Sequence, residues 1–142
     1  MRSALIVTSD SALRLALIRL FGRHGWWVDA PACGDRAVGF LTEDPRSLTL
    51  VDWQTTSVGA STFLTAIRAH PVWHAARVMV ICCGSSPEET KRAVELGAND
   101  ILGMPFRLDE VMSKIELLRP PLEGIALNPN IRVQSIDPML RY

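Results

Sequence analysis

The stretch LTLVDWQTTSVGA, residues 48–60, is an apolar run that ends in Asp52 and is followed at once by small polar residues and glycine. A run with apolar residues at consecutive positions is typical of a parallel strand that is covered on both faces. A carboxylate at the end of a buried strand loses hydration energy unless a partner satisfies it. Asp52 is therefore either a phosphorylation or metal site, or a structural hydrogen-bond acceptor.

Short apolar runs and amphipathic segments alternate along the chain on both sides of Asp52. Five such strand-helix units predict a doubly wound parallel α/β sheet in the order 2-1-3-4-5, with two helices on one face and three on the other. A ligand crevice is expected at the carboxyl ends of the strands. The predicted strands are 4–7, 26–31, 47–52, 77–83 and 99–103, and the predicted helices are 13–25, 34–44, 60–70, 86–98 and 107–118.

Composition excludes several classes of protein. The 142 residues fit one main domain, and 15 basic against 15 acidic side chains create no global field for nucleic acid or anionic membrane. No apolar run is long enough to cross a bilayer, and the amino terminus does not have the pattern of a signal peptide. The three cysteines, Cys33, Cys82 and Cys83, match no metal or disulfide spacing and favour reduced thiols in the cytoplasm.

The pattern changes near residue 119. We predict a domain over residues 1–119, followed at 120–142 by a proline-containing linker or carboxyl-terminal arm with a small hairpin at 125–133. The alternative is that 120–142 begins an effector domain that is truncated here, because LEGIALNPNIRVQSI resembles the first strands of a winged-helix domain.

Five motifs, LIVTSD, LTLVDW, VMVICCGS, ELGANDIL and GMPF, have the order and spacing of a response-regulator receiver domain of two-component systems. Asp52, Cys82 and Met104 are 30 and 22 residues apart, which matches that family's phosphoacceptor aspartate, switch hydroxyl and lysine. The resemblance covers residues 3–118 and implies a flavodoxin-like fold and a signalling role without enzyme activity.

The resemblance also implies a site from which this sequence departs. In such domains an acidic pair holds magnesium together with the phosphoacceptor and a backbone carbonyl, here that of Gln54. The acidic pair falls here on Thr8 and Ser9, and neutral hydroxyls are poor magnesium ligands. We therefore expect a degenerate receiver without magnesium or another cofactor. The remaining family positions are Cys82 and Ile101 for the switch pair, and Met104 before Pro105, a bond that is typically cis in the family.

Two residues keep alternative readings. Asp10 follows the family's acidic pair by one position, and it is either the N-cap of the next helix or a displaced metal ligand. Asp52 is either held by nearby hydroxyls and amides, with Thr8, Ser9 and the backbone after it as the expected donors, or phosphorylated.

The sequence thus predicts an atypical receiver that acts by binding a protein partner or by homodimerisation through residues 87–118, the family's usual dimer surface. A histidine kinase partner stays open, no membrane contact is expected, and nucleic acid would be bound only through an effector domain. The alternatives are a small-molecule sensor that uses the vacated acidic pocket, and a phosphorylatable receiver of a winged-helix transcription regulator.

Overall fold

The computed structural model describes residues 2–31, 34–54, 59–83 and 87–117. The chain divides into two compact units, Met1–Leu108 and Asp109–Tyr142, and each is described by itself. The predicted boundary at residue 119 and the predicted hairpin at 125–133 lie outside the described residues. Among the helices of the described part of the chain, none is long and apolar enough to cross a membrane.

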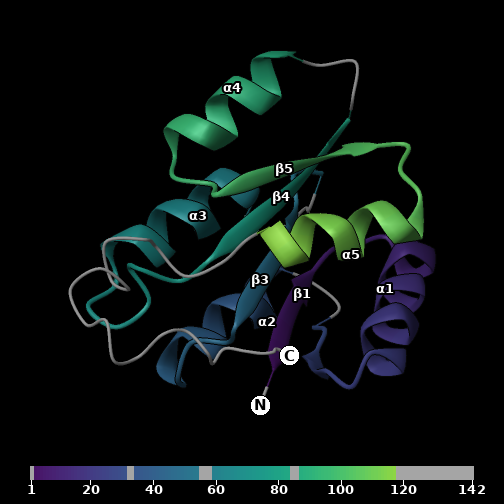
Figure 1. The fold of residues 1–142 in the computed structure, drawn as a ribbon. Helices are drawn as coiled ribbons and strands as arrows, with labels where there is room; N and C mark the ends of the chain where they lie inside the picture. Colours follow the sequence, from purple (N-terminus) through teal and green to yellow (C-terminus); the bar gives the residue numbers. More distant parts are fainter. Residues whose placement is uncertain (1, 32–33, 55–58, 84–86, 118–142) are drawn as a thin grey trace, which may run out of the picture. The chain divides into compact units, whose positions relative to one another are not determined.

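A five-stranded parallel sheet forms the centre of the first unit (Figure 1). The strand order is β2-β1-β3-β4-β5, which confirms the predicted 2-1-3-4-5 topology. All five residues of β3 are buried, including Thr49 and Asp52, as its mostly apolar sequence predicts for a central strand covered on both faces. The strands are β1 Ser3–Val7, β2 Trp27–Asp29, β3 Leu48–Asp52, β4 Val78–Cys83 and β5 Asp100–Met104.

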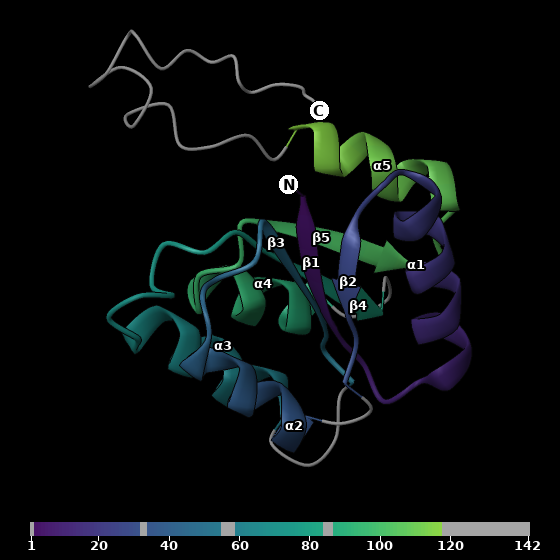
Figure 2. The same ribbon diagram turned by 90° about the horizontal axis from the view of Figure 1, so that it is seen from below.

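Helices cover both faces of this sheet. Figures 1 and 2 show α1 against one face and α2, α3 and α4 against the other. The fifth helix, α5, belongs to the second unit apart from its first residue. Acidic residues in its first turn interact favourably with the positive, amino-terminal end of the helix dipole. The helices are α1 Ser11–Arg23, α2 Gly34–Gly39, α3 Ala60–Ala69, α4 Pro87–Glu95 and α5 Leu108–Leu117.

The second helix is shorter than the predicted 34–44. It ends at Gly39 and continues as one 3₁₀ turn over Phe40–Thr42, and the chain is extended from Glu43. Glycine has a low helix propensity, and Thr42 Oγ1 donates a hydrogen bond to the Gly39 carbonyl at 2.9 Å. This bond satisfies a carbonyl at the helix end, so the tighter 3₁₀ turn replaces a further α-helical turn.

One hydrophobic core joins the sheet to α2, α3 and α4. Leu5, Val51 and Val80 face this side from three neighbouring strands and pack with Phe63 and Ile67 of α3. Residue pairing across the sheet is in register, with Val7 opposite Val51 and Asp52 opposite Ile81. This register places the residue after β1, Thr8, beside Asp52 at the carboxyl edge of the sheet.

Arg68 of α3 fastens the opposite, amino edge of the sheet. Its guanidinium donates to the carbonyls of Ala76 at 2.6 Å and Gly97 at 2.6 Å, and to Asn99 Oδ1 at 3.0 Å. Burial lowers the pKa of this guanidinium. Gly97 has φ +107°, and a Cβ there would lie 2.7 Å from Arg68 Nε, so glycine is required on both grounds. One side chain therefore joins the α3–β4 and α4–β5 connections.

We expect Arg68→Met to destabilise the fold by about 1–3 kcal/mol, because several partly buried carbonyls lose their donor while the aliphatic stem is kept. Chemical denaturation measures the change in the free energy of unfolding. Arg19→Met on the exposed part of α1 is the matched control and should stay within about 0.5 kcal/mol of wild type. Equal stability of the two variants would contradict this role of Arg68.

Candidate functional site

Asp52 ends β3 and is 7% exposed, so its carboxylate is almost completely removed from water. Thr8, which follows β1 and is 0% exposed, donates its hydroxyl proton to Asp52 Oδ2 at 2.7 Å. The short distance is typical of a hydroxyl that donates to a carboxylate. This bond ties the ends of two adjacent strands together and satisfies one oxygen of the buried acid.

The other oxygen of Asp52 is held by the chain that follows it. The backbone N–H of Gln54 donates to Asp52 Oδ1 at 3.0 Å, which forms a local turn of the kind that aspartate favours. The two expected donor classes, a hydroxyl after β1 and an amide after residue 52, are thus both present. They come from Thr8 and Gln54.

Thr8 also connects the site to α1. Its Oγ1 accepts a hydrogen bond from the backbone N–H of Asp10 at 3.1 Å. The Asp10 carboxylate in turn accepts from the amides of Ala12 at 3.0 Å and Leu13 at 3.1 Å. Asp10 is therefore the N-cap of α1, which is the first of its two predicted roles, and its Oδ1 is engaged at the helix end.

Two side chains that contact Thr8 and Gln54, the partners of Asp52, were not identified from the sequence. Arg14 Nη1 donates to the Thr8 carbonyl at 3.3 Å, which places a cation near the end of β1. The side-chain amide of Gln54 reaches Glu89 of α4, with Nε2 3.3 Å from Oε2. No sequence motif distinguishes Arg14 from the other charged residues of the helix, so its contact with the Thr8 carbonyl could not be predicted. Glu89 lies 35 residues from Gln54, a separation that no local pattern reveals.

The remaining family positions lie on β4, β5 and the turn that follows. Cys82 is 1% exposed and belongs to the apolar core with Val80 and Phe63, so it packs as a small hydrophobe. Ile101 is half-buried against the same core. Met104 ends β5 and is 38% exposed. Its bond to Pro105 is cis, in agreement with the sequence-based expectation.

The donor set around Asp52 does not match the preferences of magnesium. This ion takes oxygen ligands, dehydrates reluctantly and is usually bound by carboxylates. Thr8 directs its proton toward Asp52, and the Asp10 carboxylate caps α1. Among the described residues there is no group of three or more acidic, histidine or cysteine side chains suited to a metal. The residues present therefore do not fit the ion that the resemblance implies.

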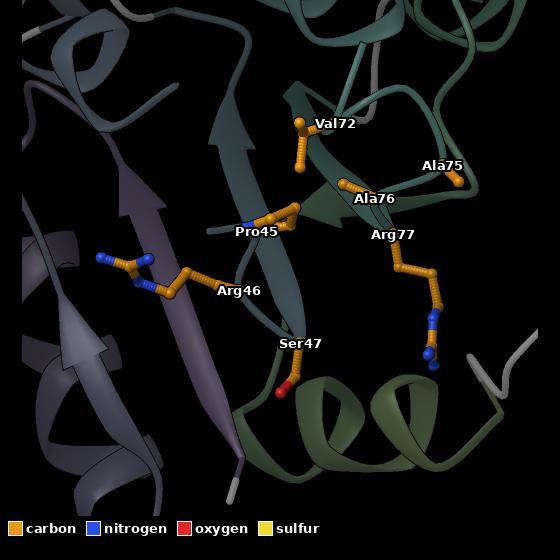
Figure 3. Close-up of a pocket in the computed structure, with 7 residues that line it drawn as sticks. All are labelled: Pro45, Arg46, Ser47, Val72, Ala75, Ala76 and Arg77. Atoms are coloured by element: carbon orange, nitrogen blue, oxygen red, sulfur yellow. The ribbon is translucent and has the colours of Figure 1, made fainter. Parts of the chain in front are cut away.

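A hollow of about 240 Å³ lies at the other edge of the sheet, where β3 and β4 begin (Figure 3). Figure 3 shows the guanidinium groups of Arg46 and Arg77 pointing away from it on opposite sides. Arg46 pairs instead with Asp29 at 2.9 Å and Glu43 at 2.7 Å. This hollow is separate from the Asp52 site, and its lining is Pro45, Arg46, Ser47, Val72, Ala75, Ala76 and Arg77.

Known proteins with similar sequences are regulators. No family model matches the chain. It is 26% identical over 113 residues to a probable chemotaxis protein CheY of Rhizobium etli, which covers 79% of this chain and 88% of that protein. It is 23% identical over 139 residues to the phosphate regulon transcriptional regulatory protein PhoB of Escherichia coli, which covers 96% of this chain. The match spans 61% of PhoB, so that regulator is considerably longer.

Solved structures agree on the fold. The chemotaxis protein CheY4 of Vibrio cholerae superposes with a TM-score of 0.77 at 18% identity, over 84% of this chain and 99% of that one. Sequence similarity and fold together support a response-regulator receiver domain of the CheY type. Domains of this type are signalling modules and not enzymes.

The hydrogen bonds of Asp52 predict the effects of two substitutions on stability. Asp52→Asn keeps one oxygen for the Gln54 amide and can donate to Thr8 Oγ1, so we expect a loss within about 1 kcal/mol. Asp52→Ala leaves a buried hydroxyl and an amide without their acceptor and should lower the free energy of unfolding by about 1–3 kcal/mol. Thermal and chemical unfolding measure both. Alanine as mild as asparagine would show that the carboxylate does not hold these strand ends.

Proposed function

We propose that residues 1–119 act as an atypical receiver, which signals through contact with a protein partner or a second copy without magnesium-dependent phosphorylation of Asp52. The observation that supports this most is the 2.7 Å hydrogen bond from the buried Thr8 hydroxyl to the Asp52 carboxylate. Thr8 stands where the resemblance expects a carboxylate that binds magnesium. The aspartate is then a structural acceptor that fixes the carboxyl edge of the sheet.

Loss of charge at three positions explains why phosphorylation would be slow. Phosphoryl transfer depends on cations that neutralise the charge developing on the phosphoryl oxygens, and each such contact contributes on the order of 3 kcal/mol. Thr8 and Ser9 replace the acidic pair, and Met104 replaces the lysine. The carboxylates that would hold the metal and the side-chain cation of the family's reaction are therefore both replaced by uncharged side chains.

The proposed contact surface is the part of residues 87–118 formed by α4 and β5 in the first unit. Val94 of α4 is 54% exposed, although its neighbour Ala93 is buried in the core. Charged side chains surround Val94 on the same helix, which is the composition of a polar rim around an apolar contact. A partner that binds here would cover Val94.

Two other functions are weighed against this one. A receiver half of a longer transcription regulator is favoured by the match to PhoB, which extends over 96% of this chain and 61% of that protein. In that case a histidine kinase and an effector domain are the partners. A small-molecule sensor is disfavoured because Thr8 is 0% and Asp52 7% exposed, which leaves a ligand little access to the vacated acidic positions.

Phosphorylation can be tested with small phosphodonors. We expect no stable aspartyl phosphate by intact-mass spectrometry after incubation with acetyl phosphate and millimolar magnesium, since Thr8 and Ser9 replace the carboxylates that would hold the ion and Met104 replaces the lysine. The triple variant Thr8→Asp, Ser9→Asp, Met104→Lys restores the family's charges and is the positive control. A phosphate adduct on the wild-type protein that Asp52→Asn abolishes would falsify the proposal.

The contact surface can be tested with two valines of matched exposure. Val94 on α4 is 54% exposed and Val72, in the α3–β4 connection, is 56% exposed. We expect Val94→Glu to abolish self-association in sedimentation velocity, or capture of the cognate partner, because a charge in a desolvated contact is unfavourable. Val72→Glu is the control and should leave association unchanged. Equal effects of the two variants would remove α4 from the contact.

A further inference from the structure

Gln54 makes two hydrogen bonds that lead in different directions. Its backbone N–H donates to Asp52 Oδ1 at 3.0 Å. Its side-chain amide lies 3.3 Å from Oε2 and 3.5 Å from Oε1 of Glu89, in the first turn of α4. A single residue therefore holds the buried carboxylate with its main chain and a helix with its side chain.

The bond to Glu89 closes a continuous polar chain across the carboxyl edge of the sheet. The chain begins at the N-cap of α1, where Asp10 donates its N–H to Thr8 Oγ1. Thr8 donates to Asp52, which accepts from Gln54. Hydrogen bonds in such a series are coupled, because moving one member changes the geometry of the next. The first turns of α1 and α4 are thus connected through one aspartate.

The parts that report on the aspartate in typical receivers are not available here. Cys82 offers a thiol instead of a hydroxyl and packs in the apolar core, and Ile101 offers no aromatic ring. A buried thiol is a weaker hydrogen-bond donor than a hydroxyl, and the Ile101 side chain has no donor at all. Among the described residues, hydrogen bonds lead from Asp52 to α4 through Gln54.

We propose that Gln54 transmits the state of Asp52 to α4 through its hydrogen bond to Glu89. When the carboxylate keeps its hydrogen bonds, the turn at residues 52–54 is fixed, and Gln54 holds the first turn of α4. When the carboxylate is lost or displaced, the turn relaxes, Glu89 loses this donor, and α4 opens more often. The inference deepens the proposed function and rests on it in that α4 is the surface a partner contacts.

Glu89 is well placed for this control. It lies in the first turn of α4, where a carboxylate already interacts favourably with the amino end of the helix. Short helices depend on tertiary contacts for much of their stability, and α4 has nine residues, of which Ala93 is buried. A contact of modest strength at its first turn can therefore change how often the helix opens.

Hydrogen exchange of the full chain, read by mass spectrometry, tests the link at α4. Gln54→Leu keeps the backbone N–H but removes the side-chain donor, and we expect the amides of residues 91–96 to exchange roughly three- to tenfold faster. Gln54→Lys offers Glu89 a cationic partner and should keep exchange at the wild-type rate or slower. Glu88→Gln, which removes a charge from the same turn but not the Gln54 contact, is the matched control and should change exchange by less than about twofold.

A double-mutant comparison tests whether Asp52 acts through Gln54. Asp52→Ala should accelerate exchange of residues 91–96 in the wild-type background and add nothing in the Gln54→Leu background. Asp52→Asn, which keeps one acceptor, serves as the second variant if alanine prevents folding. Peptides of β2, which lies outside the polar chain, correct for global destabilisation. Equal acceleration in both backgrounds, or no effect of Gln54→Leu, would overturn the inference.

The exchange experiment uses neither a partner nor a phosphodonor. A coupled α4 without any partner contact at Val94 would leave this inference standing and contradict the proposed function. If α4 is not coupled to Asp52 and no aspartyl phosphate forms, this inference fails and the proposed function stands. The two failures are therefore distinguishable.

Discussion

A carboxylate buried at the end of a central strand must be satisfied, and this requirement organises the carboxyl edge of the sheet. Asp52 is 7% exposed, and water cannot solvate it as it would a surface acid. A hydroxyl at the end of the neighbouring strand and an amide in the following turn donate hydrogen bonds to its carboxylate. The parallel register brings Thr8 to Asp52, whereas the Gln54 amide is a local donor, so satisfaction of the charge depends in part on the fold.

This arrangement differs in kind from a metal site built on the same fold. A site that binds magnesium concentrates negative charge and relies on the ion to offset it. Here the two donors to Asp52 among the described residues, the Thr8 hydroxyl and the Gln54 amide, are neutral. The acid nearest in sequence to the hydroxyl pair, Asp10, serves α1 as its N-cap.

The sequence predicted the sheet well because its signals are periodic and long. Strand β3 is mostly apolar, and the order of strands follows from right-handed crossovers, so the topology and the place of Asp52 at the end of β3 were both confirmed. The predicted end of α2 at residue 44 was wrong, because the Thr42 hydroxyl donates to the Gly39 carbonyl at the helix end. Such a local hydrogen bond does not alter the hydrophobic periodicity from which the helix was predicted. Thr8 was one of several donors expected for Asp52. The register between β1 and β3 determines that Thr8 is the one beside it. The Gln54 contact with Glu89 joins residues 35 apart through a turn whose direction the sequence does not specify.

The polar chain from Asp10 to Glu89 is formed entirely by residues of the unit Met1–Leu108. Each hydrogen bond of this polar chain is therefore encoded by residues before Asp109. Recombination that exchanged the segment after Leu108 for another output module would leave these bonds intact. In evolutionary terms, the hydrogen bonding around Asp52 and the segment joined after Leu108 can vary independently of each other.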